Sequence, residues 1–216
     1  MPNYVSKALA RFQQPPPSKP QDQPYSHVKP NYGAKVQFAR PDDDSPPLDK
    51  AGKKFIQEVC GVFLFLARGV YGWLLPALSS LASQQAKPTE RTMALCKQFL
   101  DYMAMQDDTI LTYKASNMAL AIHSDASYLS EAKARSRAGG HMFMASNEEI
   151  PQNNGAVLNI LHIIRAVMSS AAEADLGALF INAKTAVSIH TQRTWPPANA
   201  NADANRQLDR SCPTHQ

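Results

Sequence analysis

The most informative group of residues surrounds a single acid, Asp125. It follows an apolar run at residues 118–122, which predicts a buried strand that ends near this acid. A basic segment comes next, with Lys133, Arg135 and Arg137. A carboxylate at the end of a buried strand, faced by a cationic loop, suits a site for divalent metal ions and a phosphate backbone. The alternative role for Asp125 is that of a turn former or helix cap.

Lys133, Arg135 and Arg137 alternate with alanine and serine. On an extended chain their side chains would point to one side, where they could contact phosphate groups. The same spacing suits a solvated strand edge, where basic residues deter aggregation. Both interpretations remain open at this point.

Two further acids, Glu173 and Asp175, lie at the start of a helix predicted over residues 169–187. The helix dipole favours acids at this position, so their presence alone does not indicate a metal site. If the helix packs on the strand, however, one acid could share a divalent metal with a strand carboxylate. Periodicity leaves open which acid faces the sheet. The apolar stripe that we expect to be buried comprises Leu176, Leu179, Phe180, Ala183 and Val187.

Other kinds of site have little support in the sequence. His123, His141 and His162 lack metal-ligand spacing and are interpreted as core or turn residues. No nucleophile elbow, P-loop or dinucleotide-binding glycine pattern is present, so neither a serine hydrolase nor a small-molecule substrate is indicated. Cys60 and Cys96 are interpreted as core residues in a reducing compartment.

The composition is that of a chain with a packed core. Of 216 residues, 44% are hydrophobic and 19% charged, and the net charge of +4 is compatible with nucleic-acid binding without indicating it. Residues 59–82 approach the length of a membrane span, but Arg68 lies near their middle, where a charge is costly. We therefore expect buried helices there and no membrane partner. The N-terminal residues lack an apolar signal region, which predicts a cytoplasmic or nuclear protein.

The elements that must position these residues fall into two parts. Residues 1–13 predict a short amphipathic helix. Residues 14–50, with more than half of the chain's 16 prolines, predict an extended connector that includes a short strand at 32–39. Residues 51–107 predict a helical unit, with helices at 53–69, 74–85 and 89–105.

The second part begins at residue 108. Its predicted strands lie at 109–113, 118–123, 138–144 and 156–164. Strands followed by a helix indicate an α+β or α/β domain over residues 108–190. The last segment, 191–216, has no periodicity and is predicted to be disordered.

Six segments, taken in order, resemble the pol polyprotein of copia-type retrotransposons, from the end of the reverse transcriptase into ribonuclease H. The family motifs are Y-V-x-K-x-L-x-R-F, G-S-L-x-Y-L, N-P-x-x-x-H-W-x-A-x-K-x-x-L, S-D-A-D/S, R-R-S-T-S-G-Y and S-S-A-E-A-E-Y-x-A. The segments that resemble them are residues 4–12, 61–66, 88–100, 123–127, 135–140 and 168–178. No single match is specific, whereas the ordered set is fairly specific.

The resemblance implies an α+β chain. A helical thumb- or connection-like segment would precede a partial ribonuclease H-like domain with a mixed sheet. It also implies that Asp125 and Asp175 hold Mg²⁺, provided that a ribonuclease H site is completed, with Glu173 as a neighbour. Lys133, Arg135 and Arg137 would then contact nucleic acid. The implied partner is an RNA–DNA hybrid or the rest of a pol polyprotein.

The chain also departs from the family. It has no polymerase Y-x-D-D turn and no D-N-x-x-A motif for a later metal-binding acid. Three hypotheses follow. The chain is a retrotransposon fragment without independent catalysis, a hybrid-binding or RNA-cleaving part of a larger assembly, or a helical protein-interaction module.

Overall fold

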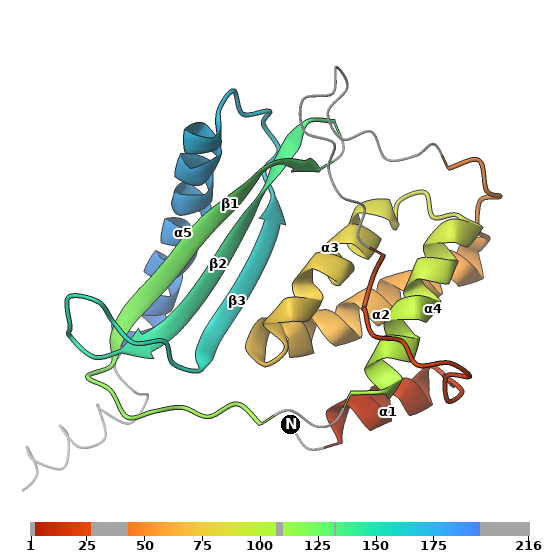
Figure 1. Cartoon of the computed structure of the whole chain (residues 1–216), viewed down its shortest axis with the longest axis horizontal. Helices are drawn as coiled ribbons and strands as arrows, with labels where there is room; N and C mark the ends of the chain where they lie inside the picture. The colour runs from red at the N-terminus through yellow and green to blue at the C-terminus, as the bar shows by residue number, and fades with distance from the viewer. Residues whose placement is uncertain (1–2, 27–42, 107–109, 132, 195–216) are drawn as a thin grey trace, which may run out of the picture.

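A computed structural model describes residues 3–26, 43–106, 110–131 and 133–194. The chain forms a helical bundle and a three-stranded sheet covered by a helix (Figure 1). This arrangement confirms the α+β class. Within the described residues, no helix combines the length and apolar character needed to cross a membrane.

The bundle consists of five helical segments: α1 (Tyr4–Arg11), α2 (Lys50–Gly69), the 3₁₀ turn η1 (Gly72–Leu74), α3 (Leu75–Gln84) and α4 (Glu90–Ala104). Side chains define where α2 and α4 begin. The Asp49 carboxylate accepts the Gly52 N–H at 2.7 Å, and Thr89 and Thr92 form a reciprocal capping box. The predicted helices are therefore confirmed to within a few residues.

The bundle core is built from large apolar side chains on α2, α3 and α4, with Val5 and Ala8 of α1 buried among them. The Tyr4 hydroxyl also donates to the Val62 carbonyl at 2.9 Å, which fixes α1 against α2. The first helix thus belongs to the bundle. Cys60 and Cys96 are buried as predicted, and burial raises the pKa of these thiols to about 11 and about 12.

In its described parts, the segment at residues 14–49 contains no helix and no strand. Residues 14–26 run beside α4, where the Gln14 amide donates to the Asp101 carboxylate at 2.6 Å. Near its other end, Leu48 N–H donates to the Pro88 carbonyl at 2.9 Å. The expected strand at 32–39 lies outside the described residues.

The sheet contains β1 (Ala119–Glu131), β2 (Arg135–Ala145) and β3 (Ala156–Ile163) in the order β1-β2-β3. Both pairings are antiparallel, so the expectation of a mixed sheet is wrong for the described residues. Residues 110–113 form no strand, although the Tyr113 hydroxyl donates to the Ala156 carbonyl at 2.9 Å. One face of the sheet carries α5 (Ala171–Thr194), and β3 contacts α2 and α3 (Figure 1).

The side of α5 that contacts the sheet is not the one predicted. Its fully buried residues are Ala174, Ala178 and Asn182, spaced four apart, and the apolar stripe of large residues faces solvent. Small residues on the facing strands, among them Ala126, Ala138 and Gly140, leave room for the helix to approach. The helix also continues to Thr194, four residues into the segment predicted to be disordered, and residues 195–216 lie outside the described part.

Candidate functional site

Asp125 lies within β1 and not at its end. The strand continues to Glu131, and Asp125 pairs with Gly139 of β2. Successive side chains of a strand point to opposite faces. Ser124 is hydrogen-bonded to Asn182 of α5 and Ala126 packs in the cluster beneath α5, so the Asp125 side chain points to the other face of the sheet.

Asp175 approaches β1 from the α5 side. Its Oδ1 atom accepts the backbone N–H of Ala126 at 3.1 Å. The helix acid therefore lies beside the residue that follows Asp125. Asp175 thus contacts the backbone of β1, whereas the Asp125 side chain points to the face of the sheet opposite α5.

Glu173 accepts hydrogen bonds at the start of α5. Its Oε2 atom accepts both the backbone N–H and the hydroxyl of Ser169, each at 2.6 Å. The Ser170 hydroxyl in turn accepts the Glu173 N–H at 3.1 Å. These bonds to Ser169 lower the pKa of the Glu173 carboxyl below its ordinary value of 4.5. Glu173 is thus a capping residue, since its carboxylate is used within the first turn.

The role of Glu173 can be tested by the pH dependence of stability. Because the folded-state pKa is depressed, its stabilising effect is present above the unfolded pKa and is lost as pH falls through the folded value. We expect Glu173→Gln to remove the loss of folding stability that protonation of Glu173 causes at low pH. Urea denaturation between about pH 7 and pH 3 measures it. Glu149→Gln, in an exposed loop, is the control, and an unchanged pH profile for Glu173→Gln would contradict the capping role.

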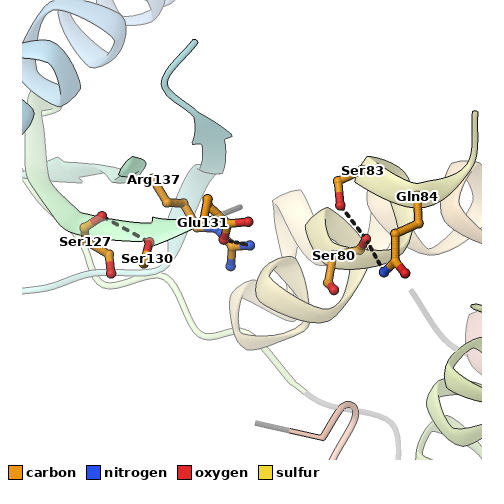
Figure 2. Close-up of polar contacts among 7 residues, drawn as sticks. All are labelled: Ser80, Ser83, Gln84, Ser127, Ser130, Glu131 and Arg137. Carbon is orange, nitrogen blue, oxygen red and sulfur yellow. Dashed lines mark hydrogen bonds and ion pairs between the residues drawn. The ribbon is translucent and has the colours of Figure 1, made fainter. Parts of the chain in front are cut away.

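The three basic residues do not form one extended row. Lys133 is exposed in the turn after β1, with φ 62°, whereas Arg135 and Arg137 share one face of β2. The Arg137 guanidinium forms an ion pair with Glu131, and both side chains are largely buried (Figure 2). The charge of Arg137 is therefore balanced within the protein and is not presented to a phosphate backbone.

An irregularity in β1 positions Glu131 for this ion pair. The register with β2 shifts between Ser127 and Glu131, and Leu129 has φ 49°. The Ser130 hydroxyl donates to the Ser127 carbonyl at 3.0 Å across the shifted segment (Figure 2). Such a bulge turns a strand residue away from its regular face. The sequence reasoning missed Glu131, although an acid preceding three basic residues could have indicated an internal pair.

An open cleft of about 310 Å³ lies where the Asp125 side chain points. The cleft separates the sheet from the start of α3, and its lining includes Leu75, Pro76, His123, Asp125, His141 and Asn159. His141 Nδ1 and Asn159 Oδ1 are 2.7 Å apart, and the His123 ring lies 5.1 Å from that of Phe143. The expectation of core or turn histidines is wrong for His162, which is exposed within β3, and for His123, which is exposed within β1. Its spacing of two residues from Asp125 was the signal for a shared face.

Among the described residues, no three histidine, cysteine, aspartate or glutamate side chains gather closely enough to hold a metal ion. Comparisons with protein-family models, curated proteins and solved structures found no match to this chain.

Proposed function

We propose that this chain is a fragment of a copia-type retrotransposon reverse transcriptase/ribonuclease H polyprotein, without independent catalysis. A helical unit over residues 51–107 corresponds to the thumb or connection, and residues 108–190 to part of a ribonuclease H-like domain. Its partner is the rest of a pol polyprotein, and Mg²⁺ would bind only in a site completed by that partner.

The contact between Asp175 and Ala126 is the main support for this proposal. The resemblance assigns one acid to a strand, at Asp125, and one to the helix predicted after the strands, at Asp175. In the structure, α5 follows β3, crosses β1 and β2, and brings Asp175 to the residue beside Asp125. The two motifs, almost 50 residues apart in sequence, thus meet at one point of the fold.

The arrangement of side chains supports the absence of independent catalysis. Two-metal hydrolysis requires carboxylates that converge on shared ions. Here Asp125 points to the cleft, Asp175 accepts a hydrogen bond from the backbone of Ala126, and Glu173 accepts two hydrogen bonds from Ser169. The charge of Arg137 is balanced by Glu131, so this residue does not support a contact with nucleic acid.

A cleavage assay on an RNA–DNA hybrid tests the proposal. With Mg²⁺ present, we expect the wild-type chain and Asp125→Asn to show the same background cleavage. Ser127→Ala, on the same face of β1, is the matched control for damage to the strand. If wild-type cleavage exceeded that of Asp125→Asn by about 100-fold or more while Ser127→Ala stayed active, the chain would be a working nuclease and the proposal would fail.

A further inference from the structure

The outward face of α5 carries an apolar surface of unusual extent. Leu176, Leu179, Phe180 and Val187 are 66%, 54%, 64% and 66% exposed. Together with Ala183 they form what we call the outer stripe. A helix that is apolar on both sides is normally covered on both sides, whereas the described residues cover only the side that meets the sheet.

The outer stripe is continuous and uncharged. At about 100° per residue, its five members cluster on the side of α5 opposite Ala174, Ala178 and Asn182. From Leu176 to Val187 it runs for three turns, or about 16 Å. Two such stripes can meet without placing like charges against each other.

We propose that the outer stripe binds the same stripe of a second copy of this chain, with the two α5 helices antiparallel about a two-fold axis. In that arrangement Leu176 lies opposite the second copy's Val187, and Phe180 lies opposite the second copy's Ala183. A large side chain then faces a small one at both central positions, an alternation that favours close packing of the two helices. A parallel arrangement would instead oppose Phe180 to Phe180 and leave a gap between the two alanines.

The apolar area of the outer stripe is large enough for the interface of a dimer. The exposed parts of its four large side chains amount to roughly 400 Å² of apolar surface, so pairing removes about 800 Å². Specific interfaces bury about 1,200–2,000 Å² in total, of which about 65% is apolar in homodimers. The outer stripe therefore supplies the apolar share of a small, specific homodimer. The Lys184 side chain, which lies over the Phe180 ring at 5.6 Å, would form part of its rim.

Sedimentation equilibrium of the full chain tests the dimer. We expect a monomer–dimer equilibrium in the wild type and a rise of about 30-fold or more in the dimer dissociation constant for Phe180→Asp. Ile150→Asp, which changes an 84% exposed residue away from α5, should leave the constant unchanged. Circular dichroism checks that each variant is folded. A wild-type chain that stays monomeric would overturn the proposal, as would equal effects of the two variants.

An exchange of residues tests the register. Phe180→Ala places alanine opposite alanine at both central positions and leaves a gap at each. Ala183→Phe places phenylalanine opposite phenylalanine at the same two positions. Each change alone should therefore weaken the dimer by about 10-fold. The double variant restores the large-to-small pairing and should return to within about threefold of the wild type. If Ala183→Phe alone strengthened association, the stripe would be generally adhesive and the antiparallel pairing would be wrong. None of these outcomes depends on hybrid cleavage.

Discussion

Gly140→Ala is expected to lower the free energy of unfolding by about 3 kcal/mol. A Cβ atom at this position of β2 would lie 2.3 Å from Oδ1 of Asn182 and 2.9 Å from Cγ1 of Ile160. Asn182 is fully buried, and its amide donates to the Ser124 hydroxyl at 2.7 Å and to the Gly139 carbonyl at 2.8 Å. Relieving the clash must displace this amide, which breaks buried hydrogen bonds and moves α5 away from the sheet.

Gly139→Ala is the matched control, because the two glycines are adjacent and their side chains would point to opposite faces. A Cβ atom at Gly139 would find its nearest neighbours at 3.8 Å, which is ordinary contact. We expect a change within about 0.5 kcal/mol. Urea denaturation followed by circular dichroism measures both variants. Equal changes in the free energy of unfolding for the two variants would show that Asn182 of α5 does not pack closely against β2.

Phe63→Ala is expected to cost about 4 kcal/mol of stability. Phe63 is fully buried in the bundle, where its ring meets Phe99 edge-on at 5.2 Å and stacks with Phe12 at 6.4 Å. Truncation removes contacts with residues of α4 and with the end of α1, so it leaves a cavity at the meeting point of three helices.

Phe65→Ala, on the same helix, is the control for helix propensity and composition. Phe65 is 61% exposed and should cost less than about 1 kcal/mol when truncated. Thermal denaturation of both variants compares them directly. If the two changes had the same effect, Phe63 would not lie at the centre of the bundle core.

The helical unit could be predicted because its signals are local. The Asp49 cap, the Thr89 cap and the apolar spacing of α4 are each contained within a few consecutive residues. What the sequence could not indicate was that α1 packs into the same core. That contact joins Tyr4 to Val62, 58 residues apart, and depends on the tertiary arrangement.

The candidate site was predicted only in part, because strand ends are set by pairing. The predicted strand covered residues 118–123, yet β1 continues to Glu131 because β2 offers pairing partners as far as Arg135. This extension placed Asp125 on the face opposite α5. The bulge that buries Glu131 likewise arises from pairing between strands.

The predicted orientation of α5 was wrong for a related reason. Periodicity locates an apolar stripe but does not identify what covers it. The sheet beneath α5 carries Gly140 and small residues, so it accepts Ala174 and Ala178 at close range and leaves no room for Leu179 or Phe180. Helix–sheet complementarity, and not hydrophobicity alone, selected the buried side.

The buried thiols of Cys60 and Cys96 give the bundle an internal kinetic reporter. A thiol reacts with alkylating reagents as the thiolate, and burial holds the pKa of these two thiols at about 11 and about 12. Alkylation near neutral pH must therefore await opening of the helices around them. The rate at which mass spectrometry finds these two positions labelled would measure how often the bundle opens, and no probe would have to be introduced.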